Sequence, residues 1–310
     1  MSVFAMNIRL GTRASALARW QANWVADALR CMGHEVTLVP ITTSGDRQTD
    51  APIRAMAGVG VFTKEIQRAL IDGAIDLAVH SLKDLPTDPE PRLALAAVPR
   101  RESVSDVLVG LHGAQLEDLP QGARIGTGSL RRRAQLLHIR PDLTMLDVRG
   151  NVETRLRKLD EGEFDALVLA EAGLIRLGLS DRITQIIPAT IMLPAPGQGA
   201  LGLETRSDDV ATRDAVAALS DPLALAGVTA ERELLRVLGG GCLAPIGAWG
   251  RIVASGALAL DAVVLGPDGQ RRLAASSAGE PSDALGMGLR VAQELVAQGG
   301  AELLAVTRRT

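Results

Sequence analysis

The chain has 310 residues, of which 47% are hydrophobic and 22% are charged, the balance of a soluble globular protein. Its net charge is −3 and aromatic residues make up only 2%, which argues against a basic face for nucleic acid and against a base-stacking platform. No apolar stretch has the length of a signal peptide or a membrane span, and two cysteines are too few for a disulfide framework. We therefore expect a cytoplasmic protein of two or three domains with no nucleic-acid or membrane partner.

The first block of the chain alternates strands and helices. We predict, in order, a strand at 8–10, a helix to about residue 32, a strand at 35–41, a loop over 42–60, a helix at 62–71, a strand at 76–79, a turn at 80–86 and a strand at 93–98. The first helix carries apolar residues at helical spacing, and we expect its packed face to hold Leu17, Trp20, Trp24, Ala28 and Cys31. This order is typical of a parallel sheet covered by helices.

The pattern then restarts and later changes. The second block holds predicted strands at 106–109, 124–126, 143–148 and 164–170, and helices at 130–139, 151–161 and up to residue 176. Residues 200–204 are predicted to form a strand that crosses back to the first sheet, and the last block to run from a helix at 223–238 through strands to a final helix at 283–297. We therefore predict three domains: 1–104 with 200–221, 105–199, and a smaller α+β domain at 222–310.

A run of three glycines at 239–241 precedes Cys242. Because glycine holds helix or strand poorly, we expect Cys242 on an exposed turn, where its thiol would be a strong nucleophile. The alternative is a glycine-rich turn with an incidental cysteine. Cys31 is interpreted as a packing residue near a helix end.

Arginines recur where strands lead into helices. Only three of the 33 basic residues are lysines, and arginines such as Arg13, Arg131, Arg132 and Arg149 follow predicted strands. Cations are disfavoured at helix N-termini unless anions accompany them, so the pattern predicts a ligand with several carboxylates, which guanidinium grips in bidentate fashion. The alternative is that residues 131–133 form a solvated charge run.

Asp84 is a single carboxylate in the turn at 80–86. It is interpreted either as an acid/base and cation-stabilising group or as a turn residue beside Lys83. The four histidines have no metal-ligand spacing, so we expect no metal.

Six blocks, in this order, resemble the porphobilinogen deaminase (hydroxymethylbilane synthase) family: Gly11-Thr12-Arg13, Val79-His80-Ser81-Leu82-Lys83-Asp84, Gly126-Thr127-Gly128-Ser129-Leu130-Arg131-Arg132, Arg149-Gly150-Asn151-Val152, Pro196-Gly197-Gln198-Gly199 and Gly240-Gly241-Cys242. The resemblance implies two α/β domains like the halves of periplasmic binding proteins, flanking a cleft, plus the α+β domain. It implies condensation of four porphobilinogen molecules, with loss of ammonia, into a linear tetrapyrrole by a monomeric enzyme.

The resemblance also assigns residue roles. Asp84 corresponds to the catalytic aspartate, and Cys242 to the cysteine that holds a dipyrromethane cofactor by a thioether. The residues that the resemblance places at the cofactor and substrate are Arg13, Ser81, Lys83, Thr127, Ser129, Arg131, Arg132, Arg149, Arg155, Arg176 and Gln198.

Two positions depart from the family pattern. Relatives commonly carry a lysine before the residue that corresponds to Phe62, where this chain has Val59, and a second serine where it has Gly128. We predict that 42–60 forms a lid with Phe62 at its end, in which Arg54 replaces the lysine; alternatively Arg54 is a solvated charge. Two other functions stay open: a receptor for organic anions that leaves Cys242 unmodified, and a cysteine hydrolase, for which no base is found nearby.

Overall fold

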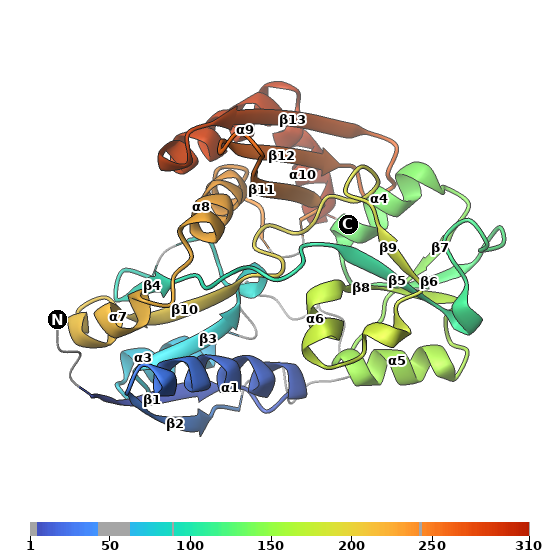
Figure 1. Cartoon of the computed structure of the whole chain (residues 1–310). Coiled ribbons are helices and arrows are strands. Elements are labelled where there is room, and N and C mark those ends of the chain that lie inside the picture. Colours follow the sequence, from blue (N-terminus) through green and yellow to red (C-terminus); the bar gives the residue numbers. More distant parts are fainter. Residues whose placement is uncertain (1–4, 43–62, 89, 242–243, 310) are drawn as a thin grey trace. The chain divides into compact units, whose positions relative to one another are not determined.

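A computed structural model describes residues 5–42, 63–88, 90–241 and 244–309. The chain forms two compact units (Figure 1). The first contains Met1–Arg101 and Ala200–Leu225, and the second contains Glu102–Gly199 and Ala226–Thr310. The second unit holds two sheets, so the predicted boundary between a second and a third domain stays a prediction.

The first unit is built on a five-stranded sheet. Its strands, in spatial order, are β2 (Glu35–Pro40), β1 (Asn7–Thr12), β3 (Leu77–Ser81), β10 (Leu201–Arg206) and β4 (Leu93–Ala97). Strands β2, β1 and β3 are parallel, whereas β10 runs antiparallel to both β3 and β4. The predicted return of the chain to this sheet at 200–204 is confirmed. The expected parallel sheet holds for β2, β1 and β3 and is wrong for β10, because the returning strand enters in the opposite direction.

Helices cover both faces of this sheet: α1 (Ala16–Cys31) and α7 (Val210–Ala217) pack on one face and α3 (Lys64–Ile71) on the other (Figure 1). Adjacent residues of β3 point to opposite faces, since Leu77 and Val79 join the α1 cluster whereas Ala78 joins the α3 cluster. Burial on both faces explains the continuous apolar runs of these strands.

The face predicted for α1 is wrong. The buried residues of the helix are Gln21, Ala22, Val25, Ala26 and Leu29. Trp20 and Trp24 are 37% and 40% exposed, and Cys31 is exposed as well. Two apolar stripes lie side by side on this helix, and the one rich in alanine is the stripe that packs against the strands.

The second unit repeats the first sheet's connectivity. Its five-stranded sheet has the order β7 (Thr144–Leu146), β6 (Arg124–Gly126), β8 (Ala166–Ala170), β5 (Asp106–Gly110) and β9 (Gln185–Ile187). Strands β7, β6 and β8 are parallel, and β5 runs antiparallel to β8 and β9. In both sheets the antiparallel strand is the one that follows a crossing from the other unit. The sequence did not indicate β9.

Helices again cover both faces of this second sheet. Helix α4 (Leu130–Ile139) packs on one face, and α5 (Val152–Asp160) and α6 (Glu171–Arg176) pack on the other. Short 3-10 turns lie at η2 (Leu82–Asp84) and η3 (Leu111–Gly113), each after a strand, at η4 (Ser180–Arg182) between α6 and β9, and at η5 (Pro281–Asp283) before the next helix.

A three-stranded antiparallel sheet completes the second unit. Strands β11 (Ile246–Ile252), β12 (Leu258–Leu265) and β13 (Arg272–Gly279) pack against α8 (Pro222–Val237), α9 (Ala284–Ala297) and α10 (Gly300–Arg309). The α+β class predicted for this part of the chain is confirmed. The predicted final helix is α9, and the prediction missed α10, which follows it after a short break.

Helix α4 also contacts this small sheet. Ala134 of α4 shares a buried cluster with Leu193 and with Val263 and Leu265 of β12. In the turn after β12, Gly269 has φ +75°, and a Cβ there would lie 2.6 Å from the backbone nitrogen of His138. The glycine therefore allows the turn to approach α4 closely.

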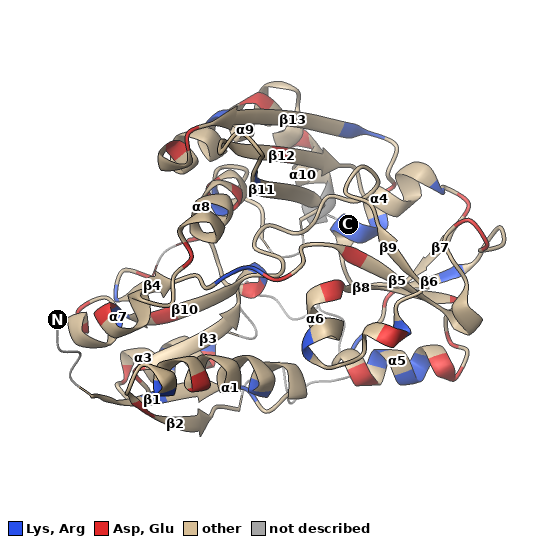
Figure 2. Cartoon of the chain, viewed as in Figure 1, with Lys and Arg blue, Asp and Glu red and all other residues tan. Residues whose placement is uncertain are grey.

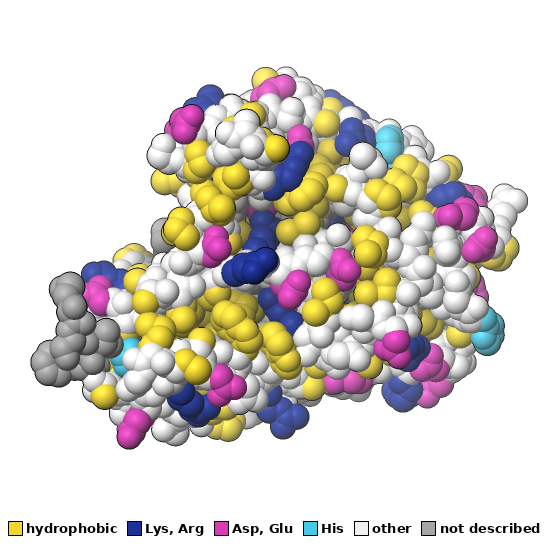
Figure 3. All heavy atoms as spheres, in the orientation of Figure 1, with side chains coloured by type: hydrophobic (Ala, Val, Ile, Leu, Met, Phe, Trp, Pro, Cys, Tyr) yellow, Lys and Arg dark blue, Asp and Glu magenta, His cyan; other side chains and the backbone are white. Residues whose placement is uncertain are grey.

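Charges of both signs are interspersed on the surface. Helix α5 carries basic and acidic residues side by side (Figure 2). On the face drawn in Figure 3, basic and acidic side chains are scattered among each other. Arg157 pairs with Glu161, and Arg182 pairs with Asp160. Within the described ranges, no helix is long and apolar enough to cross a membrane, and no group of three or more His, Cys, Asp or Glu is arranged to hold a metal ion.

Candidate functional site

The carboxyl end of β3 carries Ser81, Lys83 and Asp84. Strand β3 ends at Ser81 and continues directly into η2, whose first residue, Leu82, is buried. The Leu82 amide donates to the Ala200 carbonyl at 3.0 Å, and the Leu85 amide donates back to Leu82 at 3.2 Å. This buried anchor fixes the half-buried positions of Lys83 and Asp84 at the strand end.

Buried polar side chains support this strand end. His80 Nε2 lies 3.0 Å from Glu204 Oε2 on β10, and Gln67 Nε2 of α3 donates to Glu204 Oε1 at 2.9 Å. Gln21 Nε2 of α1 donates to Ser81 Oγ at 2.9 Å. Sequence reasoning missed these supporting residues, because each partner lies far away along the chain.

Arg13 lies at the same edge of the first sheet. Strands β1 and β3 are parallel neighbours, so their carboxyl ends meet at one edge. Arg13 directly follows β1, and Ser15 caps α1 by accepting a hydrogen bond from the Ala18 amide at 3.3 Å. The structure therefore brings Arg13, Ser81, Lys83 and Asp84 to one sheet edge, which is where ligands bind in open α/β sheets.

In the second unit, the turn between β6 and α4 holds Thr127 and Ser129. Ser129 is the N-cap of α4, and its Oγ accepts from the Arg132 amide at 3.5 Å. The Thr127 Oγ1 accepts from the Ser129 amide at 3.2 Å. The predicted start of α4 is thereby confirmed, and Arg131 and Arg132 occupy its first turn.

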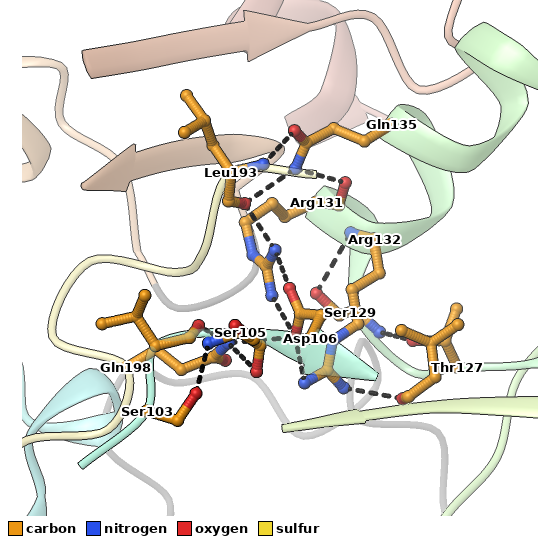
Figure 4. Close-up of polar contacts among 12 residues, drawn as sticks. Ser103, Ser105, Asp106, Thr127, Ser129, Arg131, Arg132, Gln135, Leu193 and Gln198 are labelled. Atoms are coloured by element: carbon orange, nitrogen blue, oxygen red, sulfur yellow. Dashed lines mark hydrogen bonds and ion pairs between the residues drawn. The ribbon is translucent and has the colours of Figure 1, made fainter. Parts of the chain in front are cut away.

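Both arginines meet the carboxylate of Asp106, which begins β5 (Figure 4). Arg131 Nη1 donates to Oδ2 at 2.6 Å and its Nη2 to Oδ1 at 3.2 Å. Arg132 approaches Oδ1 side-on, with Nε at 2.9 Å and Nη2 at 2.8 Å. All three side chains are buried, with Asp106 at 0% exposure. The two arginines therefore do not belong to a solvated charge run.

The two arginines keep the buried Asp106 carboxylate ionised. Burial by itself would raise the pKa of Asp106, but the charges of Arg131 and Arg132 and the hydrogen bonds from Arg131 and Gln198 hold that pKa well below its usual range. One carboxylate therefore faces two guanidinium groups. Arg131 Nε is also buried and has no hydrogen-bond acceptor among the described residues. Buried charge and unpaired donors are costly, so the cluster is suited to an anion.

The segment that leads back to the first unit is bound to this cluster. Gln198 Nε2 donates to Asp106 Oδ1 at 3.0 Å and to the Val104 carbonyl at 2.7 Å. Arg131 Nη1 also donates to the Leu193 carbonyl at 2.7 Å. Gln135 holds Leu193 from both sides, because its Nε2 donates to the carbonyl and its Oε1 accepts from the amide. Asp106 and Gln135 are residues that sequence reasoning missed.

Arg149, Arg155 and Arg176 belong to the segments that follow β7 and β8 along the chain. Arg149 is half-buried after β7, and Arg155 Nε donates to the Gly150 carbonyl at 2.9 Å. Arg176 is buried at the end of α6, where its Nη2 donates to the Gly199 carbonyl at 2.7 Å. Burial lowers the pKa of Arg176, and the nearby Glu102 opposes that shift. Strands β6, β7 and β8 are parallel, so these arginines follow strands that end at one edge.

Cys242, Arg54, Phe62 and residues 43–60 of the predicted lid lie outside the described residues. The structure explains why glycines stand at positions 239 and 240, shortly before Cys242. Gly239 has φ +59°, and a Cβ on Gly240 would lie 2.5 Å from Ile246 Cδ1 and 2.7 Å from Leu235 Cδ1. A turn after α8 and close packing therefore require these glycines.

Two family models match the chain. The model described as "Porphobilinogen deaminase, dipyromethane cofactor binding domain" matches residues 8–214, and "Porphobilinogen deaminase, C-terminal domain" matches residues 225–297. The chain belongs to the porphobilinogen deaminase family. The first match contains Asp84 and the arginines described above, and the second contains Cys242.

Relatives that are named porphobilinogen deaminase align with almost the whole chain. The protein from Acidothermus cellulolyticus is 48% identical over 98% of this chain and 92% of its own length. The protein from Geobacter sulfurreducens is 48% identical over 96% of this chain and 94% of its own length. Among solved structures, the methionine-binding protein MetQ is 13% identical, covers 69% of this chain and 89% of its own, and has a TM-score of 0.46.

Proposed function

We propose that this porphobilinogen deaminase family member condenses four porphobilinogen molecules head to tail, with loss of ammonia, into the linear tetrapyrrole hydroxymethylbilane (preuroporphyrinogen). The observation that carries this proposal is the buried cluster in which Arg131 and Arg132 share the single carboxylate of Asp106. Porphobilinogen bears an acetate and a propionate on its pyrrole, and a growing chain of pyrroles is a polyanion of the kind that such a cluster can bind.

The residues present fit a dipyrromethane cofactor. Its carboxylates would provide the acceptor that the buried Arg131 Nε lacks among the described residues, and would bring negative charge to the two guanidinium groups. Arg131, Arg132 and the nearby Thr127 and Ser129 would hold it, and Cys242 would attach it through a thioether. When bound, the dipyrromethane supplies the free α-carbon to which the first substrate pyrrole is joined.

Asp84 is proposed as the group that stabilises positive charge on the substrate. Loss of ammonia from the aminomethyl group of porphobilinogen leaves a cation that is delocalised over the pyrrole. A carboxylate near the pyrrole N–H stabilises this cation without becoming a nucleophile, and a preorganised charge of this kind lowers the barrier most when water is excluded. The anchored turn after β3 supports this proposal, because its backbone hydrogen bonds restrain the segment that carries Asp84.

The arginines are proposed to bind the substrate carboxylates and so to position the reacting carbons. Planar guanidinium groups contact a carboxylate with two parallel hydrogen bonds, which fixes orientation as well as distance. Arg13, Lys83, Arg149, Arg155, Arg176 and Gln198 are assigned to cofactor and substrate binding on the same basis, and Arg54 and Phe62 to the lid. The cytoplasmic location and the monomeric state belong to the same proposal.

The proposal is tested by the ratio of porphobilinogen consumed to ammonia released and tetrapyrrole formed. Purified protein is supplied with porphobilinogen alone, and substrate consumption, ammonia release and tetrapyrrole formation are followed together. We expect four substrate molecules and four ammonia molecules for each linear tetrapyrrole. A receptor for organic anions would bind porphobilinogen without releasing ammonia, and that result would contradict the proposal.

A further inference from the structure

Asp106 is a buried carboxylate to which the reaction assigns no role. Its side chain is 0% exposed and receives hydrogen bonds from Arg131, Arg132 and Gln198. Three different segments therefore meet at this one carboxylate: the start of β5, the first turn of α4 and the segment that leads back to the first unit.

Asp106 also determines which edge of each guanidinium group stays available. Arg131 presents its two terminal nitrogens to the carboxylate, and its Nε has no acceptor in the described part of the chain. Arg132 presents its Nε edge, and its Nη1 donates to the Val168 carbonyl at 2.9 Å. In the first turn of a helix, where the macrodipole disfavours cations, two adjacent guanidinium groups would repel each other and separate without this anion.

We propose that Asp106 is a positioning residue, which holds the guanidinium groups of Arg131 and Arg132 in the geometry that binds the carboxylates of a bound pyrrole. This inference rests on the proposed function. A positioning role differs from the effect of the charge of Asp106. The negative charge lowers the local positive charge and, by itself, would weaken the binding of an anion.

Charge alone and positioning therefore predict opposite changes in the KM for porphobilinogen when Asp106 is neutralised. Asp106→Asn keeps the shape of the side chain but raises the charge of the cluster by one. The positioning role predicts that the KM for porphobilinogen rises about tenfold or more, with a smaller change in kcat, because charge-assisted bidentate contacts are lost. It also predicts that a smaller fraction of the polypeptide carries the covalent cofactor, measured by intact mass. An unchanged or lower KM with full cofactor loading would overturn the proposal.

A second pair of variants tests the same role in a cluster with one guanidinium group fewer, where Asp106→Asn no longer leaves two adjacent cations without their anion. Arg131→Gln leaves Asp106 and Arg132 as a balanced ion pair, whereas Arg131→Gln combined with Asp106→Asn leaves Arg132 alone. By charge alone, the double variant would bind porphobilinogen more tightly than the single variant. Positioning predicts the reverse, with a KM at least several times higher in the double variant. A lower KM in the double variant would overturn the proposal.

Glu231 offers a matched control. It is equally buried on α8, and its carboxylate accepts from the backbone amides of Gly197, at 2.6 Å, and Gly250, at 2.7 Å. We expect Glu231→Gln to lower the urea midpoint of unfolding while the KM stays within about twofold. If it raised the KM as much as Asp106→Asn does, the effect would be structural and the proposal would be wrong. Failure of the proposed function is distinguishable, because then the wild-type protein itself would carry no covalent mass and form no tetrapyrrole, and both proposals would fall.

Discussion

His80 Nε2 lies 3.0 Å from Glu204 Oε2, and both side chains are almost fully buried. The contact joins β3 to the antiparallel strand β10, and Gln67 of α3 donates to the second carboxylate oxygen. Glu204 therefore connects β3, β10 and α3 just before the end of β3, where Ser81 and Asp84 lie. Glu204 belongs to the strand that returns from the other unit, so this support depends on the crossing of the chain.

The first prediction concerns this link. Glu204→Ala leaves the buried His80 and the half-buried Gln67 without the carboxylate that they contact, and unsatisfied groups of this kind cost about 2–4 kcal/mol together. We expect the free energy of unfolding in urea to fall by this amount and turnover to decrease with it. Glu90→Ala removes only an exposed partner of Arg92 and is expected to change stability little. Equal stability of the two variants would show that the buried link does not support the sheet.

The second prediction concerns Asp84. Asp84→Ala should keep the covalent cofactor wholly or in part, because Asp84 does not form the thioether, but it should lose roughly 10²–10³ in turnover as the cation-stabilising charge is removed. Intact mass and initial rates on the same preparation separate the two effects. A rate above about a tenth of wild type would place the stabilising group elsewhere.

The third prediction concerns the shape of the cation. Lysine keeps the charge of arginine but loses the planar fork. Arg131→Lys, Arg149→Lys and Arg155→Lys are therefore expected to slow cofactor assembly or chain initiation. Arg131→Lys should also be the least stable of the three, because a single ammonium cannot replace the contacts of Arg131 with both Asp106 and the Leu193 carbonyl. Normal assembly and turnover in all three variants would show that net charge alone matters.

The fourth prediction concerns acid stability. Burial would raise the pKa of Asp76, but hydrogen bonds from Arg9 and Arg206 and the charge of Arg9 lower it to about 2. The folded-state pKa therefore lies below the unfolded value near 4, so this stabilisation is present above pH 4 and is lost as the pH falls from 4 through 2. Asp76→Asn should cost about 2 kcal/mol at pH 7 and progressively less below pH 4. A cost that did not change with pH would contradict the role of the charge.

Much of the fold was predictable because its signals are local. The strand before Ser81, the helix that Ser129 caps and the return of residues 201–206 to the first sheet follow from apolar runs and capping residues. The packed face of α1 was mispredicted, because the large Trp20 and Trp24 suggested one stripe while Ala22 and Ala26 allow closer packing on the adjacent one. Which of two apolar stripes a helix buries depends on the strands that it packs against. Local periodicity carries no information about those strands.

The candidate site was predictable only in part for the same reason. The arginines at helix starts were visible as a pattern, but the sequence around Asp106 reads as an ordinary buried strand. Its partners Arg131 and Gln198 are 25 and 92 residues away, so no local signal links them. The roles of Cys242 and of the lid residues Arg54 and Phe62 stay predictions.

The intact mass of the purified protein tests the central claim most directly. If Cys242 carries a dipyrromethane, the wild-type mass exceeds the sequence mass by two deaminated porphobilinogen units. Cys242→Ser should lose this addition, whereas Cys31→Ser should keep it, because Cys31 lies on an exposed helix end in the first unit. An active wild-type protein with the unmodified sequence mass would contradict the account.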